Sequence, residues 1–515
     1  MSGAQKANPW VIAVVVSVAT FMEVLDTTIA NVALPYIAGG MAVSLDESTW
    51  VVTTYLVSNA VILTASSWLA RRLCRKRFFL ICLALFTVSS ILCGFAWDIR
   101  SLLLFRIMQG LGGGGMVPVS QSILADAFPP EKRGQGFALF GVAVVVAPVV
   151  GPTLGGWLSD NFSWHWCFLI NGPIGLLSLG MVEAFIPIDH TERPREPFDL
   201  VGFALVSIFL GALEITLDRG QIEDWFGSTF IVTTAAISAL AFLLMIPWEA
   251  SREHPVVDIR LIATRQFGSC FVVMLATGAI LIATTQMMPQ MLQINFGYTA
   301  MLAGLVLSPG GLVTMVMMLV VGRLSTLVQP RYLIATGAVI VALAMWGLTS
   351  LSGDLDFWFF ARSRIYIGLG LPLIFIPITA ASYDGAPPDK TDQASALINV
   401  ARNVGGSIGV SLAQNVLAWR EQFHESRLAE HIVASDVQYQ AAMRRLVDAF
   451  VALGSAPAEA QRQAFAWVAR QLAAQTALLA YIDVFFILAA LAACVAPLAF
   501  ILRRSRPGAA PAAMH

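Results

Sequence analysis

The feature that most constrains this chain is a succession of apolar runs, each about 20 residues long, which recurs over nearly all of its 515 residues. A run of that length crosses the hydrocarbon core of a bilayer as an α-helix. Only helices and closed barrels satisfy all backbone polar groups in that environment. Charged residues make up 12% of the chain, against about 25% in soluble domains. The sequence therefore predicts an all-α, polytopic membrane protein.

The apolar runs define about fourteen spans, an even number that puts both chain termini on one side of the membrane. Lys and Arg are concentrated in one set of alternate loops, for example Arg71 to Arg77, whereas the opposite short loops hold only Arg100 and Arg219. Because cytoplasmic loops carry the excess of positive charge, we expect cytoplasmic termini. The spans lie at roughly 9–34, 48–70, 78–97, 101–126, 135–158, 165–187, 199–217, 229–248, 267–291, 299–322, 332–351, 357–380, 393–418 and 477–502.

A weak internal repeat indicates two related halves. The fourth span contains R-I-M-Q-G-L-G from Arg106, and the twelfth contains R-I-Y-I-G-L-G from Arg364. Two six-helix bundles with two further helices inserted between them account for fourteen spans. Transporters built from such repeats bind substrate near the midplane, between the halves. We assign 1–187 to the first bundle, 188–266 to the insertion, and 267–515 to the second bundle, including a long outward loop at 419–475.

The net charge, the cysteines and the sequence motifs exclude several functional classes. A net charge of −1 gives no reason to expect a nucleic-acid partner, and the six scattered cysteines form neither a disulfide framework nor a metal site. The glycines from Gly110 to Gly115 match G-x-G-x-x-G, but they lie inside a membrane span without the βαβ unit of a dinucleotide site, so we interpret them as close helix packing. The chain has no Walker sequence. We expect no cofactor, no metal and no enzymatic activity.

Ionisable residues within the spans are the main functional candidates, because each costs about 2.5–3.5 kcal/mol at a helix centre. Glu23 and Asp26 share one face of the first span, and Arg106 in the fourth span is the natural partner of Asp26. Buried carboxylates take up and release protons near neutral pH. We therefore predict that these three residues couple transport to protons; the alternative is a structural clamp between helices.

Further polar residues in the spans are candidates for the substrate pocket or for coupling. Asp483 has an alternative role at the outer membrane interface, and for Arg402 the structural and functional interpretations are balanced. The full set is Asn31, Gln109, Gln121, Asn399, Arg402 and Asp483.

The fifth span contains a stretch of small residues and prolines, GVAVVVAPVVGPTLGG, from Gly141 to Gly156. Prolines inside a helix remove backbone donors and bend it, while small residues spaced by four let another helix approach closely. We predict a moving interface; ordinary small-residue packing is the alternative. The residues concerned are Gly141, Pro148, Gly151, Pro152, Gly155 and Gly156.

These motifs together resemble the major facilitator superfamily, and within it the fourteen-span drug:proton antiporters, most closely the EmrB-type subunits. The resemblance covers almost the full length. It rests on LDTTIANVALPYIA from Leu25, RIMQGLG from Arg106, APVVGPTLGG from Ala147, LDRG from Leu217 and ARNVGGSIG from Ala401. One loop departs from the superfamily motif G-x-L-a-D-r-x-G-r-[RK]: residues 67–76 read SWLARRLCRK, without either glycine or the aspartate. The family's cytoplasmic lock cannot be built on that missing aspartate.

The resemblance implies alternating access, with export of hydrophobic or amphipathic drugs driven by the proton gradient across a bacterial inner membrane. It also implies a periplasmic membrane-fusion adaptor and an outer-membrane channel as partners, and the loop at 419–475 is where we expect part of the adaptor contact. Three alternatives remain. They are a dedicated exporter of one metabolite or fatty acid, an uptake symporter, and a membrane enzyme or sensor, which lacks the clustered catalytic groups or soluble domain it would need.

Overall fold

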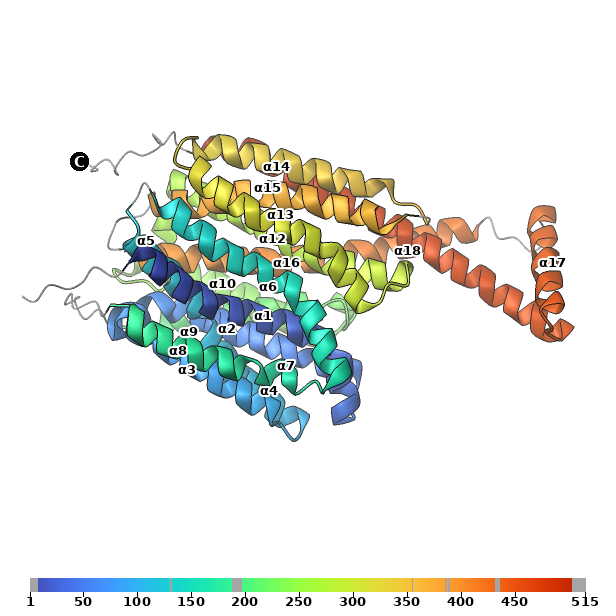
Figure 1. Cartoon of the computed structure of the whole chain (residues 1–515), viewed down its shortest axis with the longest axis horizontal. Coiled ribbons are helices and arrows are strands. Elements are labelled where there is room, and N and C mark those ends of the chain that lie inside the picture. The colour runs from blue at the N-terminus through green and yellow to red at the C-terminus, as the bar shows by residue number, and fades with distance from the viewer. Residues whose placement is uncertain are drawn as a thin grey trace, which may run out of the picture.

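The structure, a computed structural model, describes residues 8–129, 132–187, 197–353, 355–384, 387, 390–430 and 436–502. Within these ranges the chain is helical and contains no strand, and its long helices lie side by side in one elongated bundle (Figure 1). Thirteen segments of the described chain are long and apolar enough to cross a membrane. The prediction of an all-α polytopic membrane protein is confirmed.

The helices follow the chain in three groups. The first group is α1 (Pro9–Met41), α2 (Leu45–Leu73), α3 (Arg75–Gly94), α4 (Ile99–Gly113), α5 (Met116–Ala127), α6 (Arg133–Asn161), α7 (Trp166–Leu169) and α8 (Asn171–Phe185). The inserted pair is α9 (Leu200–Arg219) and α10 (Thr229–Ser251). The last group is α11 (Ile259–Ile262), α12 (Arg265–Asn295), α13 (Ala300–Leu324), α14 (Pro330–Gly347), α15 (Phe357–Asp384), α16 (Thr391–Ala429), α17 (Val437–Ala452) and α18 (Pro457–Leu498).

Local sequence explains where several helices begin. Asn8 accepts a hydrogen bond from the backbone N–H of Trp10 and precedes a proline at the first position of α1, both of which favour a helix start. Ser44 and Glu47 form a reciprocal capping box at the start of α2. Such caps supply hydrogen-bond partners for backbone N–H groups of the first turn, which have none inside the helix.

The predicted fourth span at 101–126 is one crossing but not one helix, because α4 ends at Gly113 and α5 begins at Met116. Glycine is a poor helix former, which accounts for the break in the run of glycines. Close packing, which we predicted for these glycines, is confirmed. A Cβ at Gly112 would lie 2.5 Å from the backbone nitrogen of Phe86 on α3, and one at Gly110 would lie 2.5 Å from the carbonyl oxygen of Tyr55 on α2.

The internal repeat of the sequence reappears in helix packing. Gly110 and Gly368 each follow the repeat arginine by four residues. Gly110 brings α4 against α2, and Gly368 brings α15 against the backbone of Gly310 on α13. The buried apolar side chains likewise form clusters that belong largely to the first group of helices or largely to the last. The chain boundaries of the three predicted domains stay a prediction.

The helix α16 is as long as its neighbours but too polar to count among the thirteen spans. It packs along α12, where a Cβ at Gly409 would lie 2.5 Å from the Cα of Ala279. It covers the predicted span at 393–418, which is the thirteenth of the fourteen in chain order.

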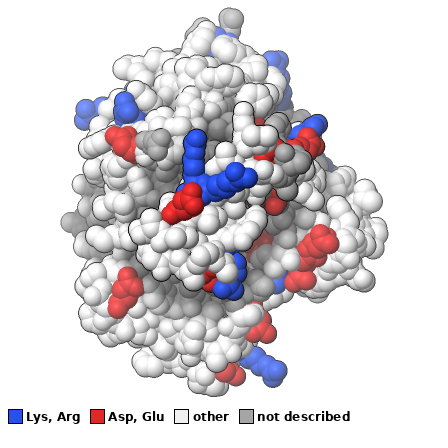
Figure 2. All heavy atoms as spheres, turned by 90° about the vertical axis from the view of Figure 1, so that its right-hand side faces the viewer, with Lys and Arg blue, Asp and Glu red and all other residues white. Residues whose placement is uncertain are grey.

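The segment expected as a long outward loop, 419–475, is largely helical in its described part. α16 continues to Ala429, α17 follows, and α18 starts at Pro457. We call the described part of 419–475 the hairpin; it projects beyond the bundle at the right of Figure 1. Figure 2 views this end of the molecule and shows acidic and basic side chains intermixed with much uncharged surface. The polar face of each amphipathic helix hides the continuation of the two spans from a search for apolar runs.

At the opposite end of the bundle, α1 begins and α18 finishes (Figure 1). The ring of Trp10 meets that of Phe128, with 5.3 Å between centroids, and Arg265 donates to the carbonyl oxygen of Ile501, 3.0 Å away. We call this the terminal end. Its assignment to the cytoplasmic side stays a prediction.

The small residues of α6 face two different helices. A Cβ at Gly151 would lie 2.7 Å from Cβ of Thr28 on α1, and one at Gly155 would lie 3.2 Å from Cα of Ile29. Gly141 faces Met318 of α13, in the other half, whereas a Cβ at Gly156 meets nothing within 4 Å. Pro148 and Pro152 both lie inside the continuous helix. The close approach predicted for this stretch is present at Gly151 and Gly155 and absent at Gly156.

Gly151→Leu should lower both thermal stability and export, because the added side chain overlaps Thr28, and overpacking costs about 1–3 kcal/mol. Gly156→Leu is the matched control on the same helix and should behave as wild type, since its Cβ enters open space. The measurements are the melting temperature of the purified protein and the export rate in proteoliposomes. A Gly151→Leu protein with wild-type values in both would contradict this role of the α1–α6 contact.

Candidate functional site: a buried charge cluster and a polar gate

The centre of the first bundle holds an ion pair between α1 and α4. The Oδ2 atom of Asp26 lies 2.7 Å from Nη1 of Arg106, and neither side chain is exposed. The other carboxylate oxygen accepts from Gln109 at 2.9 Å and from Asn171 of α8 at 2.7 Å. Asp26 thus accepts hydrogen bonds from side chains of α4 and α8. The predicted Asp26–Arg106 pair is present, and Gln109 belongs to it.

The guanidinium of Arg106 is held on several sides. Its Nε donates to the carbonyl oxygen of Val51, 3.0 Å away, and its Nη1 also donates to Gln109, 2.8 Å away. The ring of Tyr55 lies 4.3 Å below the guanidinium carbon, a distance at which cation–π attraction contributes. Arginine keeps its charge when buried, so this cation is a permanent part of the bundle core.

Glu23 lies one turn earlier on α1 and is also buried. Its Oε1 accepts from Asn59 of α2 at 3.2 Å, and Asn59 lies 3.4 Å from the hydroxyl of Tyr55. The other oxygen of Glu23 has no hydrogen-bond partner among the described residues. Arg402 of α16, in the second half, is the cation that acts on Glu23 electrostatically. Asp26 therefore has its ion-pair partner in the same half, whereas the cation whose field reaches Glu23 belongs to the other half.

Polar side chains join the two halves nearer the terminal end. Asn399 of α16 donates to Gln121 of α5 over 2.7 Å, and Ser395 donates to the carbonyl oxygen of Pro118, also over 2.7 Å. Gln121 and Asn399, which we predicted for the substrate pocket or for coupling, thus contact each other across the two halves. We call these residues, with the Arg75 contacts described next, the gate.

The loop that departs from the family motif still bridges the halves. Arg75, at the start of α3, lies 2.7 Å from Oδ1 of Asp392 in the first turn of α16, and it also pairs with Asp126 at the end of α5. Arg75 and Asp392 are both buried. The lock does not depend on the missing aspartate, because a carboxylate from the opposite half takes the arginine.

Cys74 stands where the family motif has its second glycine. Cys74 has a φ of 66°, a region that glycine occupies freely and other residues rarely adopt. Such a conformation costs about 1–3 kcal/mol and persists only where its surroundings enforce it. The turn between α2 and α3 is therefore strained, and the Arg75 contacts help to hold it.

Two predicted residues lie outside both clusters. Asn31 is exposed and donates to the carbonyl oxygen of Thr27 in its own helix. Asp483 pairs with Arg420 at 2.5 Å and with His424 at 2.7 Å, and so ties α18 to α16 beside the hairpin. Neither contacts the other candidates, and the Asp483 pairs fit the alternative role at the outer interface.

The second half does not reproduce the ion pair. Arg364, the repeat counterpart of Arg106, is buried and makes no ion pair among the described residues. α12 contains no acidic residue, so it offers no equivalent of Asp26. Arg364 is only 9% exposed, so it is a buried cation of the second half.

Sequence reasoning gave no site role to Tyr55, Asn59 and Asn171. Their types are common in membrane helices, and only packing shows that Tyr55 connects the two acids. No group of three or more possible metal ligands occurs in the described part of the chain.

Comparison with known proteins agrees with this architecture. The family model described as Major Facilitator Superfamily matches residues 16–410. The chain belongs to the major facilitator superfamily. It is a membrane transporter and not an enzyme. A human organic anion transporter, MFSD10, shares the fold, with a TM-score of 0.57 and 13% identity over 94% of this chain and 99% of that one.

Relatives within this family are named as multidrug export or resistance proteins. Multidrug export protein EmrB of Haemophilus influenzae is 38% identical, over 81% of this chain and 82% of that protein. EmrB of Escherichia coli is 35% identical over 92% of both chains. Fatty acid resistance protein FarB of Neisseria gonorrhoeae is 36% identical over 80% of this chain and 82% of that protein. The predicted EmrB-type relationship is confirmed.

Asp392→Asn should open the gate, because Arg75 loses its partner in the other half. A hydrogen bond to a charged group contributes about 1.5–3 kcal/mol, so the open population should rise about tenfold to a hundredfold. The measurement is the labelling rate of a thiol reagent at Ala394→Cys, a buried position of α16, in a background without the six native cysteines.

Arg77→Gln is the control for that experiment, since Arg77 belongs to the same loop but is exposed. It should label at the wild-type rate. If Asp392→Asn also labels at the wild-type rate, the Arg75–Asp392 contact does not keep the halves together.

Proposed function

We propose that this protein exports hydrophobic and amphipathic compounds in exchange for protons, by alternating access of the two halves. The observation that supports this most directly is the pair of buried acids on α1. Asp26 has its counter-charge, Arg106, within the same bundle, whereas the cation that acts on Glu23, Arg402, comes from the other half.

This division of charge gives a physical route to coupling. When the halves rock, the distance between Glu23 and Arg402 changes, while the Asp26–Arg106 pair moves with its bundle. An acid that loses its cation in a low-dielectric interior binds a proton more strongly. Proton binding to these acids and movement of the halves therefore favour each other. Tyr55 and Asn59, which lie between Glu23 and the Asp26–Arg106 pair, would transmit a change at one acid to the other.

The substrate class follows from the relatives and from the chemistry of the bundle. EmrB of two species is named a multidrug export protein, and apolar sites with few polar anchors suit lipophilic ligands. A dedicated exporter of a fatty acid or one metabolite is the second candidate, because FarB is similarly related. Competition by chemically unrelated compounds separates the two, since a dedicated exporter would ignore most of them.

The same proposal places the protein in a bacterial inner membrane with cytoplasmic termini, and the gate then closes the cytoplasmic side. The hairpin would meet a periplasmic membrane-fusion adaptor that leads to an outer-membrane channel. It exposes large apolar side chains, among them Phe465 and Trp467 at 49% and 43%, and exposed apolar patches mark interaction sites.

Replacing Phe465 and Trp467 together by Ser should weaken copurification of a coexpressed adaptor, because these side chains would supply apolar area to the contact. Export in proteoliposomes that contain no adaptor should stay at the wild-type rate, which separates loss of docking from loss of transport. Undiminished copurification would contradict an adaptor contact at these residues.

Asp26→Asn should reduce proton-driven export to the background rate, since the amide keeps the shape of the side chain but removes its charge and its capacity to exchange a proton. The measurement is accumulation of a fluorescent lipophilic cation in proteoliposomes under an imposed pH gradient. Asp160→Asn is the control, because Asp160 is exposed at the end of α6 and bonds only Tyr36 among the described residues.

Comparable amounts of inserted protein must be verified for both variants. Undiminished export by Asp26→Asn would contradict its assignment as a coupling residue. A wild-type protein whose accumulation ignores the pH gradient would contradict proton coupling as a whole.

A further inference from the structure

A third buried acid lies outside the charge cluster, on the inserted helix α9. Glu214 is 9% exposed. α9 packs against α2 of the first half and against α16 of the second half. Glu214 thus lies where the first half, the insertion and the second half meet, at a position with no role in the coupling described above.

The hydrogen bonds of Glu214 are incomplete for a carboxylate. Both of its oxygens lie 2.8 Å from the hydroxyl of Ser407 on α16. A hydroxyl has one proton and therefore donates to only one of them at a time. No other hydrogen bond to Glu214 occurs among the described residues, so one oxygen is always left without a donor.

The surroundings offer Glu214 no positive charge. Within the described chain it has no ion pair, and the charged side chain that acts on it is Asp218, one turn later on α9. Asp218 is itself an acid and bonds Thr53 of α2. α2, α9 and α16 bring Ala60, Leu63, Leu210, Val400, Asn403 and Val404 to the site. An ionised carboxylate that is buried without a cation costs several kcal/mol.

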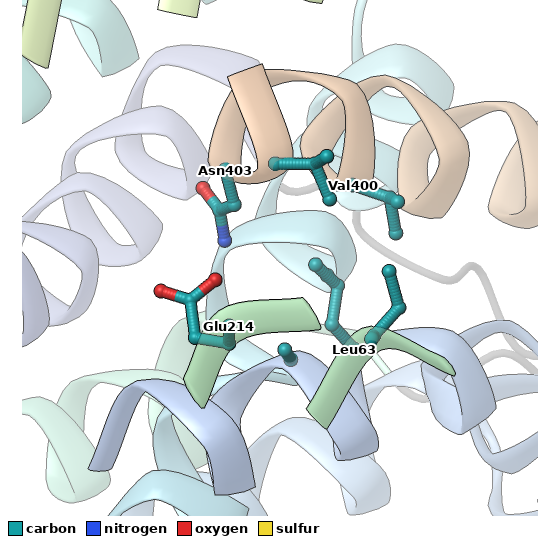
Figure 3. Close-up of a pocket in the computed structure, with 7 residues that line it drawn as sticks. Leu63, Glu214, Val400 and Asn403 are labelled. Carbon is teal, nitrogen blue, oxygen red and sulfur yellow. The ribbon is translucent and has the colours of Figure 1, made fainter. Parts of the chain in front are cut away.

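Beside Glu214 is a cavity of about 10 Å³, between α2, α9 and α16. Figure 3 shows Glu214 and Asn403 pointing toward one another from opposite walls, with Leu63 and Val400 beside them. The volume is about that needed for one water molecule, and the two polar side chains provide its partners. The cavity is therefore large enough for one water molecule beside the acid.

We propose that Glu214 is a further proton-binding site, which holds a proton as a carboxylic acid while α16 packs against α9. The step is proton transfer from a hydronium ion to the carboxylate, which leaves neutral water and a carboxyl group that now has a donor of its own. When α16 moves with the second half, Ser407 and Asn403 leave Glu214, water reaches the acid, and the proton departs to water. This inference rests on the proposed proton coupling and adds a site to it.

Infrared spectroscopy of the purified full-length protein at neutral pH tests the protonation directly. The wild type should show a carboxylic-acid carbonyl band that Glu214→Gln lacks and that Glu214→Asp retains at a shifted frequency. Ser407→Ala should keep the band but move it to higher frequency, because the carboxyl group loses a hydrogen-bond partner. Glu223→Gln, at a half-exposed acid near the end of the same helix, should give the wild-type spectrum.

A transport measurement tests whether that proton is exchanged during the cycle. With the membrane potential clamped at zero, each proton exchanged per substrate multiplies equilibrium accumulation by ten for each pH unit of gradient. At a gradient of one unit, Glu214→Gln should therefore accumulate about tenfold less substrate than the wild type. Glu214→Asp should accumulate at the wild-type level.

A Glu214→Gln spectrum that keeps the full wild-type carboxyl band overturns the proposal, and so does unchanged accumulation. These failures are distinct from failure of the proposed function. If wild-type accumulation ignores the pH gradient, proton-coupled transport is wrong, while the infrared band still reports whether Glu214 carries a proton.

Discussion

The buried ion pair between Asp26 and Arg106 is the interaction on which the first bundle depends. Neither side chain is exposed, and the pair draws donors from α4 and α8 while Arg106 also bonds the backbone of α2. Removing one partner of such a pair leaves an uncompensated charge, at a cost of about 3–5 kcal/mol. Four helices are thus held in register around a charge that could not stay in lipid alone, and the rest of the bundle can pack through small residues.

The two halves share a repeat but not a distribution of charge. Arg364 repeats Arg106 in sequence and in its glycine-mediated packing, yet it has no acid beside it in the described chain. The second half instead supplies Arg402, whose positive charge acts on Glu23 of the first half without an ion pair between them among the described residues. The buried acids of α1 and the cation Arg402 therefore lie in different halves.

Contacts between the halves combine charged and neutral groups. The Arg75–Asp392 bridge seals the terminal end together with the amide bond between Gln121 and Asn399, and the rings of Phe137 and Tyr383 stack there at 5.4 Å. The family's aspartate is missing from the loop, but Arg75 still bridges the halves because it pairs with a carboxylate on α16. A motif can therefore lose a residue and keep its mechanical role when another element supplies the same charge.

The sequence by itself determined the membrane class, the spans, the repeat, and the partnership of Asp26 with Arg106, because long apolar runs and buried charges leave few physical options. It did not determine that span four breaks at its glycines, that the two spans flanking 419–475 continue as helices into the hairpin, or that Asp483 belongs to the base of the hairpin. Only the tertiary structure decided which polar side chains meet, as with Asn171 at Asp26, Gln121 at Asn399 and Ser407 at Glu214. Those contacts join helices far apart in the chain, and local pattern contains no information on which faces pack together.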